Sequence, residues 1–264
     1  MRSIRVADTG LKPARWNVAM TSALVELHRA GRIPDMLRFH RYPFSLLIGR
    51  NSILGQEARV DRLGLQRTEL ARRMTDGDPI WVNPGILAFD LIADRGVANV
   101  HPGKAAHCVR SGIVNGLRRL GLPARPGSLT DIEINGHKVF EGSYCLDGPT
   151  FLFQGMVVVE AAAGVLWSAR LSSKDRSAAP FSRVASIAEF LGRDSLMDET
   201  TDVLVAGLAH ALPYMSAAAR LGDDEIALSD RLLAEKIGTD EFVLGESLAL
   251  AVASSMRRKR SFSK

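Results

Sequence analysis

Two long segments of the chain repeat apolar residues at the spacing of an amphipathic helix. The first extends from about Pro13 to Ala30, and its apolar face consists of Trp16, Met20, Ala23, Leu24 and Leu27. The second extends from about Gly103 to Leu120, and its apolar face consists of Ala106, Val109, Ile113, Leu117 and Leu120. A glycine follows each segment and is a natural helix stop. We therefore predict a helix in each segment.

Shorter apolar or alternating runs, bounded by turn-forming residues, predict strands before residue 160. These runs are Leu37–His40, Phe44–Ile48, Ile80–Ile92 with a turn at Pro84-Gly85, Ile132–Ile134, His137–Val139 and Phe151–Val159. The pair Asn135-Gly136 separates two of them and favours a type I′ hairpin turn, because both residues tolerate a positive φ angle. The stretch Thr75–Pro79 is rich in turn formers and predicts a loop.

The remaining segments have weaker patterns. Arg59–Leu70 is mixed and mostly polar, which predicts a short helix or a loop. After Ala161, helical patterns return at Asp202–Leu212, Leu228–Ile237 and Glu246–Ala253, joined by polar loops. Because strands and helices do not alternate regularly, the chain favours an α+β fold over a doubly wound sheet.

Composition narrows the class of protein. Hydrophobic residues make up 46% of the 264-residue chain and charged residues 24%, the balance of an ordinary globular domain. No run of about eighteen apolar residues occurs, and the first residues lack an apolar signal region. We therefore expect no membrane partner and a cytoplasmic location. Cys108 and Cys145 are too few for a disulfide framework, and no spacing of cysteine and histidine suggests zinc.

The net charge of +5 is concentrated at the end of the chain. Without Arg257, Arg258, Lys259, Arg260 and Lys264, the chain holds 29 basic and 29 acidic residues. The charge therefore belongs to a basic tail, residues 256–264, which we expect to be disordered. It does not indicate a basic fold, and we expect no nucleic-acid partner.

Common catalytic motifs such as the P-loop, HExxH and GxSxG are absent from the sequence. Two regions nevertheless combine charge with glycine inside predicted β structure. They are Arg72–Gly85, which reads RRMTDGDPIWVNPG, and Asp131–Ser143, which reads DIEINGHKVFEGS. Taken singly, these residues also have plain structural interpretations, namely surface charge for Arg72 and Arg73, a solvated strand lysine for Lys138, and turn residues for Asp76 and Asp78.

The two regions resemble the lipoate–protein ligase A family, within the wider group of biotin and lipoate ligase catalytic domains. That family has Arg-Arg-x-Ser-Gly-Gly-Gly-Ala-Val-x-His-Asp-x-Gly-Asn in the first region and Lys-(Ile/Val)-x-Gly-Ser-Ala after a short hairpin in the second. The matching residues are Arg72, Arg73, Gly85, Asp131, Lys138, Val139, Gly142 and Ser143, the last two after one extra residue. Further similar segments are Asn17-Val18-Ala19, Leu37-Arg38-Phe39, Leu46–Asn51 and Phe153-Gln154-Gly155.

The resemblance covers roughly residues 1–195 and implies a biotin/lipoate ligase-like catalytic domain, with a mixed or antiparallel sheet flanked by helices. It leaves residues 196–255 as a small helical C-terminal extension. It also implies a reaction in which ATP activates lipoate, or a similar acid, and the acyl group passes to a lysine of a lipoyl-domain carrier. That carrier is of the 2-oxoacid dehydrogenase E2 or glycine cleavage H type. In the split form of the family, a separate accessory ligase chain is a further partner.

The family pattern assigns roles to residues in both regions. Lys138 follows the Asn-Gly turn and is the expected catalytic residue, since a positioned ammonium group can meet the phosphate and the acyl carboxylate. Neighbouring strand residues face opposite sides, so one arginine of the pair is expected to face the pocket, and the pattern favours Arg73. The expected substrate- and nucleotide-binding residues are Arg72, Arg73, Thr75, Gly77, Asp78, Pro79, Ile80, Trp81, Asp131, Gly142 and Ser143.

The chain departs from the family where the family keeps glycines. The departures are Thr75-Asp76-Gly77-Asp78 for Ser-Gly-Gly-Gly, Val82 for the histidine, Ile86 for the final asparagine, and a lost glutamine near Tyr144 and Cys145. Two carboxylates here would repel a polyphosphate by on the order of a few kcal/mol at ~4 Å and an effective dielectric constant of about 20. Mg²⁺ that bridges Asp76 and Asp78 to phosphate would reverse the sign.

Two other functions stay open. One is acyl transfer from a carrier without ATP, as in the octanoyltransferases that share this fold. Cys145 is the available nucleophile for it, although those enzymes place theirs elsewhere in the pattern. The other is a catalytically degenerate relative that binds a lipoyl domain or a ligase partner, and the replaced glycine loop motivates it.

Overall fold

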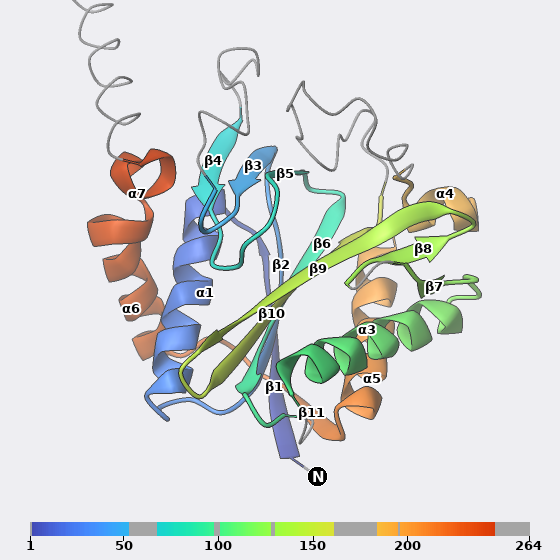
Figure 1. Ribbon diagram of the computed structural model, residues 1–264, viewed down its shortest axis with the longest axis horizontal. Coiled ribbons are helices and arrows are strands. Elements are labelled where there is room, and N and C mark those ends of the chain that lie inside the picture. Colours follow the sequence, from blue (N-terminus) through green and yellow to red (C-terminus); the bar gives the residue numbers. More distant parts are fainter. Residues whose placement is uncertain are drawn as a thin grey trace, which may run out of the picture.

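Figure 1 shows a computed structural model of the protein, which describes residues 2–52, 68–97, 101–127, 130–160, 184–194 and 196–245. The larger sheet contains β1 (Arg2–Leu11), β2 (Met36–Arg41), β6 (Ile86–Asp94), β7 (Arg125–Pro126), β8 (Ile132–Ile134), β9 (His137–Asp147), β10 (Thr150–Val158) and β11 (Tyr214–Ala218). The smaller sheet contains β3 (Ser45–Ile48), β4 (Glu69–Arg72) and β5 (Ile80–Val82). The helical segments are α1 (Ala14–Arg29), α3 (Pro102–Arg119), α4 (Ile187–Leu191), α5 (Met197–Ala211), α6 (Asp223–Leu232), the π-helical η3 (Leu233–Ile237) and α7 (Asp240–Leu244).

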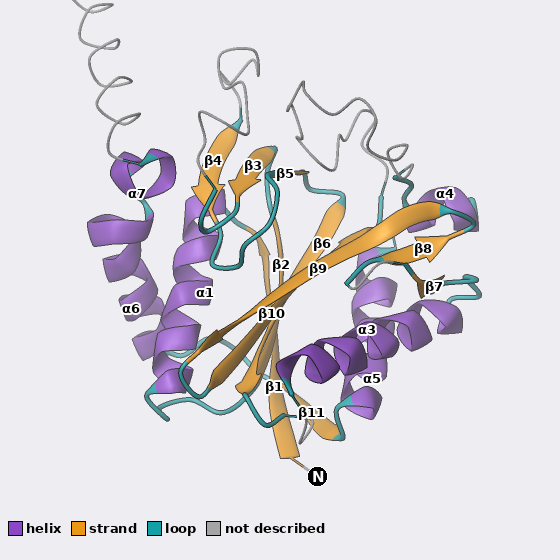
Figure 2. Ribbon diagram, in the orientation of Figure 1, coloured by secondary structure: helices purple, strands orange, loops and turns teal. Residues whose placement is uncertain are grey.

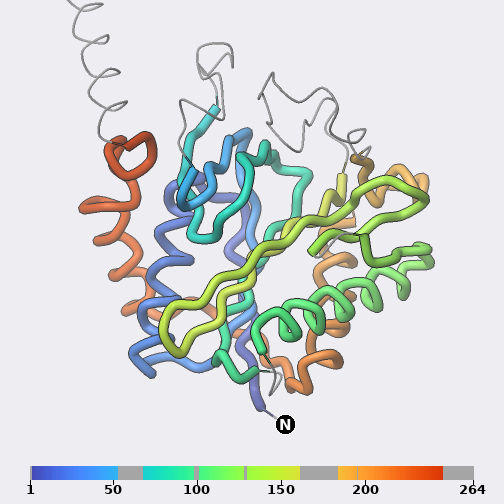
Figure 3. Tube along the Cα trace, viewed as in Figure 1, coloured from blue at the N-terminus to red at the C-terminus, as the bar shows by residue number. Residues whose placement is uncertain are grey.

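The larger sheet is mixed. Within the described residues its eight strands lie in the order β11-β1-β2-β6-β10-β9-β8-β7. The strands from β2 to β7 in this order pair antiparallel, whereas β1 pairs parallel with both β2 and β11. The long β9–β10 hairpin crosses the molecule diagonally (Figure 3). A mixed sheet flanked by helices confirms the predicted α+β class.

Helices cover both faces of the larger sheet (Figure 2). On one face, α3 and α5 pack over the main core, where Phe89, Phe140 and Phe153 stack on one another. On the other face, α1 and the smaller sheet share an apolar cluster with β6 and β10, and α6 packs against α1. Almost the whole length of β6 is buried, because it lies between these two layers.

The helices and strands predicted before residue 160 are confirmed with small changes at their ends. Asn135 and Gly136 have φ angles of 50° and 81°, as a type I′ turn requires. The structure adds three strands that the pattern did not predict, β1, β7 and β11, and it makes Glu69–Arg72 a strand. Outside the described residues lie most of Arg59–Leu70, Glu246–Ala253 and the basic tail, residues 256–264. No helix in the described part of the chain is long and apolar enough to cross a membrane.

The elements after residue 196 are built into the same core. β11 extends the larger sheet beside β1, and α5 packs closely on α3. A Cβ atom at Gly207 would overlap the carbonyl oxygen of Gly112, so the close approach of these helices requires glycine. The segment expected to be a small helical extension thus contributes a strand as well as helices. The domain boundary at residue 195 stays a prediction.

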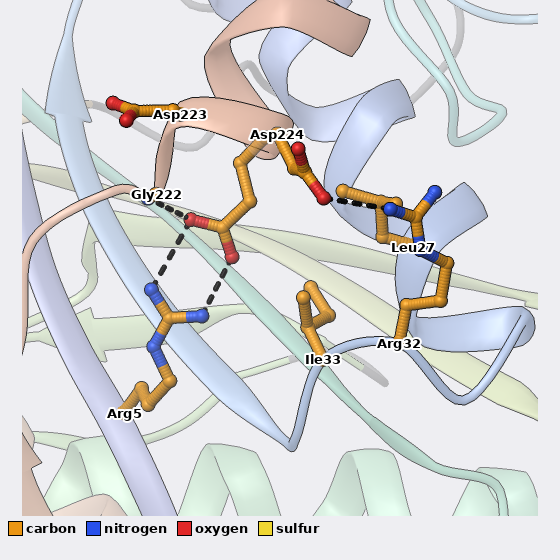
Figure 4. A pocket seen from close by; sticks show the side chains of 8 residues that line it. Arg5, Leu27, Arg32, Ile33, Gly222, Asp223 and Asp224 are labelled. Atoms are coloured by element: carbon orange, nitrogen blue, oxygen red, sulfur yellow. Dashed lines mark hydrogen bonds and ion pairs between the residues drawn. The ribbon is translucent and has the colours of Figure 1, made fainter.

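A buried carboxylate joins α6 to the sheet. Glu225 accepts hydrogen bonds from the backbone nitrogen of Gly222 at 2.5 Å and from Nη1 of Arg5 on β1 at 2.6 Å. Arg32 pairs with Asp224 at 2.7 Å beside them. Figure 4 shows Arg5 and Arg32 pointing toward the start of α6 across a hollow. Because both arginines have carboxylate partners, these contacts serve to attach α6.

Candidate active site

One face of β9 belongs to the main core. Phe140 stacks on Phe89 with ring centroids 6.2 Å apart. A Cβ atom at Gly142 would lie 2.5 Å from the ring of Phe153, so Gly142 faces the same core and only glycine fits there. Successive residues of a strand face opposite sides. Glu141 and Ser143, which alternate with Phe140 and Gly142 along the strand, therefore face away from the core.

The opposite face of β9 contacts the loop between β4 and β5, which lies beside it in Figure 1. Glu141, Ser143 and Cys145 occupy this face at alternating positions. The hydroxyl of Ser143 donates to Oγ1 of Thr75 at 2.7 Å. The thiol of Cys145 lies 3.9 Å from the carbonyl oxygen of Met74. This face of β9, together with the loop, forms the candidate active site.

A β-bulge turns Lys138 toward the candidate site. The pairing of β8 with β9 shifts register here, which leaves Val139 as an extra residue of β9. Bulges re-aim neighbouring side chains. Lys138 and Glu141 are three residues apart and would face opposite sides of a regular strand, yet Nζ lies 3.1 Å from Oε2 of Glu141. The same Nζ lies 3.1 Å from Oδ2 of Asp131, just before β8.

The amine of Lys138 is held in its charged form. Its side chain is 16% exposed. Burial by itself lowers the pKa of Lys138, but the carboxylates of Glu141 and Asp131 outweigh burial and raise that pKa above its ordinary value. The site therefore contains a fixed positive charge with two anionic partners.

Arg73 orders the loop between β4 and β5. Its side chain is only 2% exposed. The guanidinium group donates to the carbonyl oxygens of Leu47 at 3.3 Å, Asp78 at 3.1 Å and Asp76 at 2.9 Å. Burial lowers the pKa of Arg73, and Glu141 is the strongest of the charges that oppose this effect. Arg73 thus places a buried positive charge directly beneath the loop.

The neighbouring Arg72 faces the other way, as strand alternation predicts. Its guanidinium group donates to the carbonyl oxygens of Gly49 and Ser52, both at 2.8 Å, after β3. It also donates to those of Phe242 at 3.0 Å and Val243 at 2.8 Å in α7. Arg72 therefore ties α7 to the smaller sheet, away from the face of β9 that carries Lys138.

The carboxylate of Asp76 accepts hydrogen bonds from neighbouring residues of the protein. Its Oδ2 accepts from Nδ2 of Asn51 at 3.0 Å, and its Oδ1 accepts from the backbone nitrogen of Gly77 at 3.0 Å. The hydrogen bond from Asn51 is the main cause that lowers the pKa of Asp76. The described residues contain no group of three or more His, Cys, Asp or Glu side chains that could hold a metal ion. Asp76 and Asp78 therefore do not form a preformed metal site with other described side chains, and Mg²⁺ binding at these two residues stays a prediction.

A buried hydrogen-bond network, which the sequence did not reveal, supports the loop from below. Thr75 donates to Oε1 of Gln154 at 2.8 Å, and Nε2 of Gln154 donates to Oδ1 of Asp90 at 2.9 Å. The other oxygen of Asp90 accepts from Thr21 at 2.8 Å and lies 3.4 Å from Nε of Arg38. Asp90 and Arg38 are both fully buried. A charged residue within the apolar strand β6 was the signal that could have located this network.

His40 and Tyr42 complete the network without adding charge. Nε2 of His40 lies 3.1 Å from the hydroxyl of Tyr42. Burial, reinforced by the charge of Arg38, holds the pKa of His40 well below its usual range, so the imidazole is neutral. Burial also raises the pKa of Tyr42, which keeps the phenol protonated. Arg38 and Asp90 are therefore the charged pair at the centre of this network.

The structure brings together only part of the predicted binding set. Gathered around the face of β9 are Arg73, Thr75, Gly77, Asp78, Asp131, Lys138 and Ser143. Ile80 packs instead in the apolar cluster beneath α1 with Met156. Trp81 lies on the other side of β5 and packs with Val243 of α7, and Pro79 before them is buried. Gly142 faces the main core, as described above.

Within the described part of the chain, Cys145 lacks the surroundings of a catalytic nucleophile. Burial raises the pKa of its thiol, which disfavours the reactive thiolate. The partner of its sulfur is the carbonyl oxygen of Met74, which is no base. Cys108, the second free cysteine, packs from α3 against the main core.

The mixed sheet with its lysine-bearing hairpin belongs to a family whose named members are acyl-transferring enzymes. Residues 13–209 match the lipoyl protein ligase A/B catalytic domain, and the chain belongs to this family. The named relatives in it are lipoate ligases and octanoyltransferases.

Individual relatives cover almost the whole chain. Lipoate-protein ligase A subunit 1 of Thermoplasma acidophilum is 26% identical over 256 residues, which is 88% of this chain and 92% of the relative. The octanoyltransferase LipM of Brevibacillus brevis is 24% identical over 90% of this chain and 97% of the relative.

Solved structures show the same fold. Protein Ta0514 of Thermoplasma acidophilum with bound lipoic acid has a TM-score of 0.77 at 23% identity and covers 93% of this chain and 100% of its own. A lipoate-protein ligase A bound with ATP has a TM-score of 0.78 at 23% identity and covers 93% and 99%. At this level of identity the likeness concerns the fold alone.

Proposed function

We propose that this protein is a lipoate–protein ligase that activates lipoate, or a similar carboxylic acid, with ATP and transfers the acyl group to a carrier lysine. The observation that carries the proposal is the charged amine of Lys138, fixed at a β-bulge beside the loop that Arg73 orders. Two comparisons support it: a ligase subunit resembles the chain over nearly its full length, and proteins of this fold bind lipoic acid or ATP.

The proposed reaction has two steps. In the first, a carboxylate oxygen of the acid attacks the α-phosphorus of ATP, the bond from this phosphorus to the bridging oxygen breaks, and pyrophosphate leaves. In the second, the lysine amine of the carrier attacks the acyl carbon and loses a proton, and AMP leaves with the electron pair of the carbon–oxygen bond. Negative charge develops at the phosphate in both steps, and a fixed ammonium group stabilises it. Lys138 takes this role.

The altered glycine loop fits this proposal better than its two aspartates suggest. Asp76 is engaged with Asn51 and with the amide of Gly77. The buried guanidinium group of Arg73 lies under the same loop and offsets its negative charge. We infer that Thr75, Gly77 and Asp78 border the phosphates of ATP. No step of the reaction is assigned to Mg²⁺.

We propose a lipoyl domain as the carrier, of the 2-oxoacid dehydrogenase E2 or glycine cleavage H type. A solved structure that matches the fold of this chain with a TM-score of 0.78 comes from a structural study of a bi-partite lipoate protein ligase and its E2 lipoyl domain from Thermoplasma acidophilum. The chain also covers 92% of a relative named as one ligase subunit. This supports a separate accessory chain as a second partner.

The test is an acyl-transfer assay followed by intact mass spectrometry. Wild-type protein, incubated with ATP, lipoate or octanoate and a lipoyl domain, is expected to add one acyl group to the domain. Lys138→Ala should lower the rate by about 100-fold, the effect of removing one group that stabilises transition-state charge. Lys236→Ala, an exposed lysine on η3, is the matched control and should match wild type. Equal rates for Lys138→Ala and wild type would show that Lys138 is not the catalytic cation.

The second candidate function is octanoyl transfer without ATP, because LipM relatives resemble the chain over 90% of its length. It requires a nucleophile that carries the octanoyl group as a thioester. Incubation with an octanoyl carrier and mass analysis of the protein tests it, with Cys145→Ser as the control. A thioester on Cys145 would favour this function over the ligase. A protein that binds lipoyl domains but neither ATP nor lipoate would be a degenerate relative.

A further inference from the structure

Glu141 lies where an anionic substrate would meet Lys138. Its Oε2 is 3.1 Å from Nζ of Lys138, and its charge acts more strongly on Arg73 than that of any other carboxylate near this arginine. Building on the proposed function, we propose that Glu141 is a tethered competitor of the acyl phosphate, a specificity-determining carboxylate that leaves Lys138 when the anion binds.

The bulge in β9 creates this contact. In a regular strand without a bulge, residues three apart such as Lys138 and Glu141 would lie on opposite faces. With the bulge, Glu141 reaches Lys138 from the same face on which Ser143 reaches the loop. The local chain path therefore places a carboxylate in contact with Lys138 and near enough to Arg73 to act on its charge.

Glu141 is better suited to leave than Asp131, the other partner of Lys138. The side chain of Glu141 is 24% exposed and that of Asp131 is 17% exposed. Glutamate also has one more rotatable bond, so it can turn toward water while its backbone stays in β9. Lys138 has three N–H donors, and release of Glu141 frees one of them for a phosphate oxygen while Asp131 keeps the amine in place.

Electrostatic repulsion favours this release. The carboxylates of Glu141 and Asp131 both lie 3.1 Å from Nζ of Lys138. A phosphate that approached this amine with Glu141 in place would be repelled by both of them. Anionic ligands therefore gain from displacing Glu141, whereas uncharged ligands do not.

The experiment compares Glu141→Gln with wild type. Calorimetry with octanoyl-AMP and with pyrophosphate, in low salt and without Mg²⁺, measures anion binding. Glu141→Gln should bind both about tenfold more tightly, which corresponds to ~1.4 kcal/mol. In the transfer assay its KM for ATP should fall by a similar factor while kcat does not rise. Glu141→Asp keeps the charge on a shorter side chain. Its affinity for octanoyl-AMP and pyrophosphate should lie between those of wild type and Glu141→Gln.

Glu133→Gln is the matched control. Glu133 lies in β8 of the same hairpin, and its carboxylate pairs with Arg125 at 3.7 Å. The Glu133→Gln variant should bind octanoyl-AMP with the same affinity as wild type. Melting temperatures show whether each variant folds, and Glu141→Ala replaces Glu141→Gln if the latter does not.

Several outcomes would overturn the competitor role. One is that wild type binds octanoyl-AMP and Glu141→Gln binds it no more tightly. Another is a higher Mg²⁺ requirement in the variant, which would mean that Glu141 holds a cation. If no variant binds octanoyl-AMP but Glu141→Gln gains pyrophosphate affinity, the ligase proposal fails and the competitor role stands. If Glu141→Gln gains neither while wild type transfers acyl groups, only the competitor role fails.

Discussion

The hydroxyl of Ser143 lies 2.7 Å from the hydroxyl of Thr75, and this contact joins the strand of Lys138 to the loop that Arg73 orders. Thr75 in turn donates to Gln154, which donates to the buried carboxylate of Asp90. The position of the loop relative to Lys138 is therefore set by a hydrogen-bond chain that begins in the interior. Changes in that chain are expected to affect stability and site geometry together.

Replacement of Thr75 by valine should destabilise the protein by about 1–2 kcal/mol, because Oε1 of buried Gln154 loses its shorter hydrogen bond and keeps only the one from the backbone nitrogen of residue 75 at 3.3 Å. Ser143→Ala removes a hydroxyl from the same chain but leaves the bond between Thr75 and Gln154 intact, and should cost about 1 kcal/mol or less. Urea unfolding measures both free energies. Equal losses of unfolding free energy in the two variants would show that the bond between Thr75 and Gln154 contributes no more to stability than the bond between Ser143 and Thr75.

Asp90→Asn should lower the free energy of unfolding more than Asp147→Asn, a matched change at an exposed ion pair. Asp90 neutralises Arg38, and both side chains are fully buried, so loss of the charge should cost about 3–5 kcal/mol. Asp147→Asn breaks an exposed pair with Arg29 at 3.2 Å and should cost about 0–1 kcal/mol. Chemical denaturation distinguishes the two. An Asp90 variant as stable as the Asp147 variant would contradict the importance of the buried pair.

Gly77→Ala should disturb the loop for two reasons. Its φ angle of 118° is unfavourable for alanine, and a Cβ atom would lie 2.7 Å from Nη2 of Arg73. We expect a loss of about 1–3 kcal/mol and a fall in acyl-transfer rate. Gly192→Ala is the control, since Gly192 also has a positive φ angle, 65°, but has open space around the added atom. A smaller loss in Gly77→Ala than in Gly192→Ala would count against the steric contact.

The pairing of Lys138 should make stability depend on alkaline pH. Its pKa is raised above the ordinary 10.5 in the folded state, so its stabilising contribution is fully present below that value. The contribution is lost as pH rises through the folded-state pKa. The difference in unfolding free energy between wild type and Lys138→Gln should therefore be constant between about pH 7 and 9 and shrink above the ordinary value. A difference that grows with pH would contradict the assigned ion pairs.

Local patterns were sufficient for the elements that form from local interactions. The helices α1 and α3 follow from apolar spacing, and the turn at Asn135-Gly136 follows from the tolerance of both residues for positive φ. The order of motifs around Arg73 and Lys138 was also enough to indicate the family. In contrast, β1 and β11 were missed. They pair with each other although more than 200 residues separate Arg2 from Tyr214, and β1 has no clean alternation of buried and exposed residues.

The sequence by itself therefore determined the family, the α+β class and the hairpin that carries Lys138, because these depend on residue types at short spacing. Only the tertiary structure decided what surrounds this lysine. Thr75 and Gln154 are 79 residues apart, and Asp76 meets Asn51 across 25 residues. The contact between Lys138 and Glu141 depends on a bulge set by strand pairing. Contacts of this kind arise when distant segments pack, and the order of residues along the chain does not reveal them.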